Sequence, residues 1–331
     1  MRVLITGATG FLGSHLCRRM VAEGHDVRII SRSASDSTPL EGLSLDRIIG
    51  DVTDSRSVRT AVRDREWVIH AAANLNDRRW DQDWQMKVNV EGTRNIAQAC
   101  RAEGVRRLLH VSSVAAIGIP TSPQHPANEE FPFNLENSGL TYHLTKRQAE
   151  EEVMTEVTRG LDAIIVNPAS VKGPHGTQYR GGEIVRAVRR TPVVPYFSGG
   201  ICVVHVQDVV EGILAALRQG ATGHRYILGG ENLTFRALAE RAAKAMGLGR
   251  RFIPVPRMVT GPAAMILEPW GLLWNHRPWI TYTIHYCASR FQFYDSSKAC
   301  KALGYAPRDF SAILDECLRM GRVGPTPVRS V

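Results

Sequence analysis

The chain has 331 residues, of which 44% are hydrophobic and 22% charged, and a formal net charge of +9. This length exceeds what one compact core usually organises, so we expect a main domain and a smaller lobe. Basic residues are spread along the expected helices, as in Arg18–Arg19 and Arg106–Arg107. The charge therefore indicates solvated helix faces and attraction of an anionic ligand, and we expect no nucleic-acid partner.

The six cysteines are scattered, at positions 17, 100, 202, 287, 300 and 317, and include no C-x-x-C pair. This spacing indicates neither a disulfide framework nor a zinc site, so we expect no metal and a reducing, cytoplasmic location. No apolar window approaches the length of a membrane span, and the first apolar run is too short for a signal peptide.

The first thirteen residues carry the strongest local pattern. Residues 3–5 form a short apolar run that is typical of a buried strand. Gly7, Gly10 and Gly13 then recur at every third position, and helical periodicity begins at Ser14. A strand, a glycine turn and a helix N-terminus in this order form a cradle for a diphosphate. The alternative is a tight turn that only connects strand to helix.

Strands and helices alternate along the following part of the chain. Strands are expected at 26–31, 47–51, 67–73, 107–112 and 161–166, and helices at 54–64, 84–103 and 140–158. This alternation predicts an α/β fold with a doubly wound parallel sheet and helices on both faces. Right-handed crossovers would place the carboxyl ends of the strands, and a ligand, at one edge.

The end of the second strand bears on which dinucleotide the cradle would hold. An acidic residue there would bind the adenosine ribose and indicate NAD. This chain has Ser31, Arg32 and Ser33 instead, and the first acidic residue is Asp36. Arg32 can pair with a 2′-phosphate, which favours NADP, or it can be an exposed loop residue stacked over adenine. Asp51 can accept a hydrogen bond from adenine or cap the next helix.

Residues suited to acid–base chemistry follow. Ser112 and Ser113 end the fifth expected strand, and Tyr142 and Lys146 lie on the next helix. Positions i and i+4 share a helix face, so the phenol and the ammonium can address one ligand. A nearby ammonium lowers the ordinary phenol pKa of about 10, and a serine hydroxyl can hold a substrate oxygen as charge develops. The Y-x-x-x-K spacing alone is common by chance, but its position after the glycine turn is informative.

This order of motifs resembles the extended short-chain dehydrogenase/reductase superfamily, which implies a Rossmann domain. The resemblance rests on Thr6–Gly13 and on Tyr142 with Lys146, and further segments agree with it: His70–Ala73, Asn89–Thr93, Val111–Ser113, Asn167–Pro168, Gly173–Pro174, His205–Val209, Arg225–Gly230 and Leu303–Pro307. Within the superfamily, the chain is most similar to the dihydroflavonol-4-reductase-like branch. That branch includes 3β-hydroxysteroid dehydrogenases and hopanoid-associated epimerase-like proteins.

The resemblance implies a role for each matching residue. Tyr142 becomes the general acid/base, and Lys146 binds the nicotinamide ribose and lowers the Tyr142 pKa. Ser113, rather than Ser112, orients the substrate oxygen, and Asn89 supports a proton relay or only a helix-to-loop hydrogen bond. Besides Tyr142 and Lys146, the residues expected to bind NADP or NAD are Gly7, Thr9, Gly10, Phe11, Leu12, Gly13, Arg32, Asp51, Val52, Ala71, Ala72, Ala73, Pro168 and Val171.

Three positions depart from the superfamily pattern. Asn167 and Lys172 stand where arginine and tyrosine are usual, and Gln207 replaces a frequent aspartate. These departures put the substrate class in doubt more than the cofactor. We expect Lys172 to be a solvated loop residue or a substrate contact.

Beyond residue 171 the pattern is less regular. We expect a helix at 183–190, a strand at 201–206 that rejoins the main sheet, and a helix at 207–218. We assign residues 1–171 and 199–230 to the main domain, 172–198 and 231–320 to a smaller mixed α/β substrate lobe, and 321–331 to a disordered tail. Several aromatic residues of the lobe would form its core, a pocket wall or a surface patch that touches lipid: Trp270, Trp274, Trp279, Tyr282, Tyr286, Phe291 and Phe293.

These patterns predict a cytoplasmic NAD(P)-dependent oxidoreductase acting on a ketone or secondary alcohol of a bulky apolar or aromatic substrate. A nucleotide-sugar epimerase or dehydratase would use the same catalytic residues and is the first alternative. A non-catalytic dinucleotide sensor is the second. The expected partners are a small-molecule substrate and a second copy of the chain in a homodimer.

Overall fold

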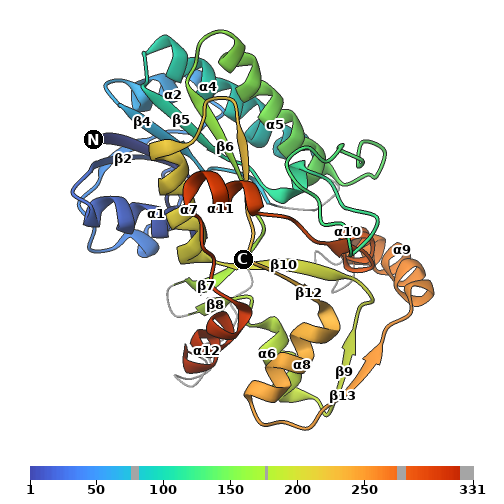
Figure 1. Cartoon of the computed structure of the whole chain (residues 1–331). Helices are drawn as coiled ribbons and strands as arrows, with labels where there is room; N and C mark the ends of the chain where they lie inside the picture. Colours follow the sequence, from blue (N-terminus) through green and yellow to red (C-terminus); the bar gives the residue numbers. More distant parts are fainter. Residues whose placement is uncertain (76–81, 176–177, 274–280, 321–331) are drawn as a thin grey trace.

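The computed structural model of the chain describes residues 1–75, 82–175, 178–273 and 281–320. Its largest element is a seven-stranded parallel sheet in the order β11-β6-β5-β4-β1-β2-β3 (Figure 1). The strands are β1 (Arg2–Thr6), β2 (Asp26–Ser31), β3 (Asp46–Ile49), β4 (Trp67–His70), β5 (Arg107–Val111), β6 (Ala163–Pro168) and β11 (Arg225–Leu228). The predicted α/β fold with a doubly wound parallel sheet is confirmed.

Helices cover both faces of this sheet. One face carries α1 (Phe11–Ala22), α7 (Val206–Gln219) and α11 (Ser297–Leu303), and the other carries α2 (Ser55–Val62), α4 (Gly92–Ala102) and α5 (Thr141–Thr158) (Figure 1). In β1, Val3 and Ile5 belong to the core under α1 and α7, whereas Leu4 belongs to the core under α2 and α4. Burial from both sides explains why the strand is apolar throughout.

The sheet order places a ligand crevice beside β1. The strand that follows β1 in the chain lies on one side of it and β4 lies on the other. Ligands of doubly wound sheets bind at such a reversal of strand order, at the carboxyl ends of the strands. The glycine turn after β1 and the residues that end β2, β4 and β5 therefore meet at one edge.

The helix expected at 84–103 forms in three pieces. α3 (Gln82–Met86) leads into a π-helical turn (Lys87–Glu91) and then into α4. Within the π turn, the buried Asn89 side chain donates to the carbonyl oxygen of Asn74 at 3.1 Å and to the Thr145 hydroxyl at 3.1 Å. Such turns are frequent at functional sites.

A second part of the molecule contains two further sheets (Figure 1). One joins β7 (Ser170–His175), β8 (Gln178–Arg180), β10 (Gly200–His205), β12 (Glu231–Thr234) and β14 (Phe291–Gln292), and the other pairs β9 (Val193–Tyr196) with β13 (Arg251–Pro254). Its helices are α6 (Glu183–Arg190), α8 (Phe235–Ala245), α9 (Arg257–Leu273), α10 (Tyr282–Ala288) and α12 (Phe310–Met320). The helix predicted at 183–190 is confirmed.

One strand differs from its expected place. The run at 201–206 forms β10, but it pairs with β7 and β12 in the smaller sheet rather than rejoining the main sheet. The main sheet ends on β11, which pairs with β6. An apolar run specifies burial and not the neighbouring strand, so the expectation was wrong about the partner. The assignment of residues to two domains stays a prediction.

The aromatic residues of the lobe lie in different environments. Phe293 is buried, Tyr282 and Tyr286 are half-buried in a contact with each other, and Trp270 is 62% exposed. The core interpretation therefore holds for Phe293 but not for Trp270. Trp274, Trp279 and the tail at 321–331 lie outside the described residues. Among the helices that the structure describes, none combines the length and apolarity needed to cross a bilayer.

Candidate active site

Close backbone approach shapes the glycine turn between β1 and α1. Gly7 has a φ of +68°, and a Cβ there would lie 2.6 Å from the backbone nitrogen of Ala72. A Cβ on Gly13 would overlap the Gly7 carbonyl oxygen. Gly10 is the N-cap of α1, and within the described part of the chain no side chain caps the helix, so its first N–H groups remain for a ligand. This backbone cradle fits the diphosphate of a dinucleotide.

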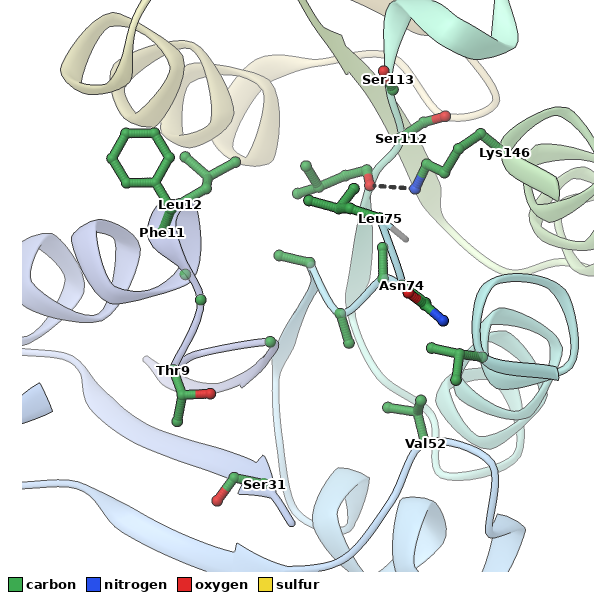
Figure 2. A pocket seen from close by; sticks show the side chains of 18 of the residues that line it. Thr9, Phe11, Leu12, Ser31, Val52, Asn74, Leu75, Ser112, Ser113 and Lys146 are labelled. Atoms are coloured by element: carbon green, nitrogen blue, oxygen red, sulfur yellow. Dashed lines mark hydrogen bonds between the residues drawn. The ribbon is translucent and has the colours of Figure 1, made fainter. Parts of the chain in front are cut away.

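The turn forms one wall of a cavity of about 730 Å³ (Figure 2). All of the residues predicted for catalysis and cofactor binding line it: Gly7, Thr9, Gly10, Phe11, Leu12, Gly13, Arg32, Asp51, Val52, Ala71, Ala72, Ala73, Ser113, Tyr142, Lys146, Pro168 and Val171. They range from Gly7 to Val171, so the edge of the sheet brings together residues that lie far apart in the sequence. Their individual roles stay predictions.

Several lining residues were not predicted. Asn74 and Leu75 follow the Ala71–Ala73 segment directly, and extending that segment would have found them. Arg180 comes from β8 in the smaller lobe, and its guanidinium lies 5.4 Å from the centre of the Phe11 ring. The sequence around Arg180 contains no motif that indicates this position.

Two buried histidines lie beneath the site without a charge. His70 Nδ1 is 2.7 Å from the Thr6 hydroxyl, and its Nε2 is 3.0 Å from the Thr93 hydroxyl. Burial, assisted by the nearby Lys146, lowers the pKa of His70 to about 3. The same causes hold the pKa of His110 well below its ordinary value. Both imidazoles are therefore neutral parts of the scaffold at neutral pH.

Lys146 is the largest fully buried side chain at the site, with 2% exposure. Its Nζ donates to the carbonyl oxygen of Val111 at 3.0 Å, which holds the ammonium at the end of β5 (Figure 2). Burial lowers its pKa to about 8, against a smaller raising effect of Glu150. Lys146 therefore titrates much closer to neutrality than an ordinary lysine.

Tyr142 lies one helical turn before Lys146, at the rim of the cavity. Burial raises the pKa of Tyr142 to about 12, and a hydrogen bond with the Ser113 side chain acts in the opposite direction. The Ser113 hydroxyl also accepts from the Ala115 backbone nitrogen at 3.2 Å. Ser112 is buried, and its hydroxyl has no hydrogen-bond partner within the described chain. These contacts associate Ser113, rather than Ser112, with Tyr142.

A second layer of polar residues holds Ser113. The Asn167 side chain donates to the Ser113 carbonyl oxygen at 2.9 Å and to the Glu150 carboxylate at 2.6 Å. Glu150 is 3% exposed and forms an ion pair with Arg225 at 3.4 Å. Asn167, one of the departures from the superfamily pattern, thus joins β6 to the backbone of Ser113. Its side chain is not among those that line the cavity.

At the other end of the cavity, β2 and β3 contribute positive charge. Arg32 is exposed and lines the cavity, while Arg47 donates to the Ser31 hydroxyl at 2.8 Å and to the Ser37 hydroxyl at 2.7 Å. The Asp36 carboxylate accepts a hydrogen bond from the Thr38 backbone nitrogen at 2.9 Å. Arg47 was missed because it belongs to the neighbouring strand and carries no motif.

Contacts show which residue caps α2 and where Lys172 lies, whereas the contact of Asp51 with adenine stays a prediction. Asp54, and not Asp51, caps α2, accepting from the Arg56 and Ser57 backbone nitrogens. Asp51 instead accepts from Thr53 and lines the cavity. Lys172 is a partly buried residue of β7, so the expectation of a solvated loop lysine was wrong. It is not among the residues that line the cavity.

A sequence profile of the NAD dependent epimerase/dehydratase family matches residues 3–229. The chain belongs to this family. A sterol demethylase protein B of Methylococcus capsulatus is 36% identical to this family member over 275 residues, which are 81% of the chain and 82% of the relative. A putative dihydroflavonol 4-reductase of Synechocystis is 30% identical over 305 residues, with 91% and 88% covered.

A crystal structure of gox2253 agrees with the fold of this NAD dependent epimerase/dehydratase family member. It superposes with a TM-score of 0.81 at 33% sequence identity, and the match covers 97% of the chain and 98% of gox2253. The resemblance to the extended short-chain dehydrogenases/reductases is therefore confirmed, and the chain is an oxidoreductase of an NAD-binding family.

Proposed function

We propose that this family member is an NADP-preferring ketoreductase or alcohol dehydrogenase for a bulky apolar or aromatic substrate. The observation that carries the proposal is the convergence of Ser113, Tyr142 and Lys146 at one end of the cavity that the glycine turn begins. When bound, the nicotinamide dinucleotide supplies or accepts a hydride at its C4 atom. Gly7–Gly13 would hold its diphosphate, and Lys146 would donate to its ribose.

The catalytic side chains then handle the proton. In reduction, Tyr142 donates its phenolic proton to the substrate oxygen, and Ser113 donates a hydrogen bond to the same atom as negative charge develops. Lys146 would donate to the ribose in addition to Val111. Its positive charge would stabilise the Tyr142 phenolate that remains after the proton transfer. In the described structure, burial and Ser113 set the Tyr142 pKa, so the lowering effect of Lys146 stays a prediction.

The preference for NADP rests on charge at the end of β2. Arg32 and Arg47 lie there together, and the first acidic residue after β2, Asp36, is occupied by a backbone contact. Two arginines favour a 2′-phosphate, which an aspartate or glutamate would repel. The relatives named for sterol and dihydroflavonol chemistry support an apolar or aromatic substrate. The cytoplasmic location and the homodimer stay predictions.

The test is oxidation of NADPH with a panel of aromatic and alicyclic ketones. We expect turnover by the wild type and a loss of at least about a hundredfold in Tyr142→Phe, which removes only the transferable proton. NADPH binding, followed by fluorescence titration, should be retained in that variant. Conversion of a UDP-sugar without net consumption of cofactor would instead establish the epimerase alternative. Binding without any turnover would support a dinucleotide sensor.

A further inference from the structure

The helix α9 presents an apolar face to solvent. Its large side chains there are 57% to 87% exposed and comprise Met258, Val259, Met265, Ile266 and Trp270. Pro262 is also exposed. These positions recur at intervals of three, four and seven residues, so they form one stripe along the helix. Exposed apolar stripes of this size mark contact surfaces.

The opposite side of α9 is packed against the protein. Thr260 and Ala264 are 2% and 1% exposed, and the Thr260 hydroxyl lies 2.7 Å from His285 Nδ1 on α10. The helix is therefore held by α10, and its outward stripe is a fixed feature of the lobe. Figure 1 shows α9 at the outer edge of the lobe beside α10.

Charge at this surface is positive. Residues 250–273 contain three arginines, at 250, 251 and 257, and one acidic residue, Glu268. Arg251 lies on β13, whereas Arg257 is the exposed first residue of α9. Glu268 faces α10 and accepts from the Tyr282 backbone nitrogen at 3.4 Å. An apolar stripe with an exposed arginine at the first residue of its helix and a tryptophan near the other end matches an anionic lipid surface.

We propose that α9 docks the protein on an anionic bilayer, lying in the interface with its stripe among the acyl chains. The helix does not qualify as a membrane span, so it would lie along the surface rather than cross it. A second copy fits less well, because Glu268, the one acidic residue of α9, faces α10 and would leave the partner's Arg257 without an opposite charge.

The docking helix borders the catalytic end of the molecule. Glu268 of α9 and Tyr282 of α10 line a small cavity that Tyr142 also lines. Docking would therefore bring this small cavity beside Tyr142 close to the lipid surface, where apolar substrates are concentrated. This last step rests on the function proposed above, whereas docking itself depends only on the α9 surface.

The test is flotation of the full-length protein with phosphatidylcholine vesicles that contain about a third phosphatidylglycerol. We expect the wild type to float and the double variant Met265→Asp, Ile266→Asp to bind at least about tenfold more weakly, because both side chains would leave the acyl region. The matched control is Ile49→Asp, a change at a 59% exposed residue of β3, which should leave vesicle binding unchanged. Circular dichroism and thermal unfolding verify that each variant is folded.

A second measurement reports how deeply the Trp270 side chain enters the bilayer. Brominated lipid in the vesicles should quench part of the tryptophan fluorescence, and that part should be lost in Trp270→Phe. Absence of wild-type flotation, or equal flotation of the double variant, would overturn the proposal whatever the enzyme's activity. A wild-type dimer that the double variant converts to a monomer, without vesicle binding, would identify the stripe as an interface between copies.

Discussion

Lys146 carries a positive charge although only 2% of its surface is exposed. Its ammonium donates to the Val111 carbonyl oxygen and is attracted by the Glu150 carboxylate. The neutral imidazoles of His70 and His110 lie nearby. A charge in such surroundings is costly, and the lowered pKa expresses that cost. The sequence predicted Lys146 through its spacing from Tyr142, but it could not predict the burial, which depends on where β5 ends.

The lowered pKa of Lys146 predicts how stability varies with pH. Below pH 8 Lys146 is protonated in both the folded and the unfolded state, and the full cost of burying its charge destabilises the folded state. Between pH 8 and 10.5 the folded state releases the proton while the unfolded state keeps it, so stability rises with pH. The gain over that window is about 3 kcal/mol relative to Lys146→Met, measured by urea unfolding. Parallel curves for the two proteins would contradict this assignment.

Arg32 carries the second residue-scale prediction. Arg32→Asp places a carboxylate where we propose the 2′-phosphate, so NADPH affinity should fall by about a hundredfold while NADH affinity changes little. The control Arg56→Asp makes the same charge change on an exposed residue of α2 outside the cavity. Fluorescence titrations with both cofactors measure the ratio. An equal loss for NADH would remove the 2′-phosphate role.

The sequence predicted well those elements that are determined by their own residues. The strand β1 is buried on both faces, so its apolar composition predicted it. In the turn that follows, the backbone of other residues lies close to the glycines, so the glycine spacing predicted the turn. The π turn at Lys87–Glu91 has no such signal, because it depends on Asn89 reaching Asn74 and Thr145. The pairing of β10 is likewise decided by tertiary contacts.

The glycine turn itself can be tested as an element. Gly13→Ala would set a methyl group against the Gly7 carbonyl, so we expect a loss of about 1–3 kcal/mol in stability and of most NADPH binding. The matched control is Gly249→Ala, where a Cβ would have open space and the backbone conformation is not restricted to glycine. Thermal unfolding and cofactor titration are the measurements. A stable Gly13→Ala protein with full NADPH affinity would show that the turn is not a tight cradle.

For the whole molecule, the cavity depends on both parts of the chain. The main sheet supplies the glycine turn and the strand ends, and helix α5 supplies Tyr142. β7 and β8 add Val171 and Arg180 from the second sheet. Sequence motifs located the first group because those residues lie at ends of elements with regular patterns. They did not locate Arg180, because only the folded arrangement of the lobes brings it to Phe11.

The most direct measurement of the proposed reaction follows an isotope. NADPH carrying deuterium at C4, on each face in separate experiments, is incubated with an accepted ketone, and the product is analysed by mass spectrometry. We expect one deuterium in the product alcohol from one of the two labelled cofactors, with one NADPH consumed for each alcohol formed. A nucleotide sugar converted by enzyme-bound cofactor, with no net loss of NADPH and no label in a released alcohol, would contradict the proposed ketoreductase.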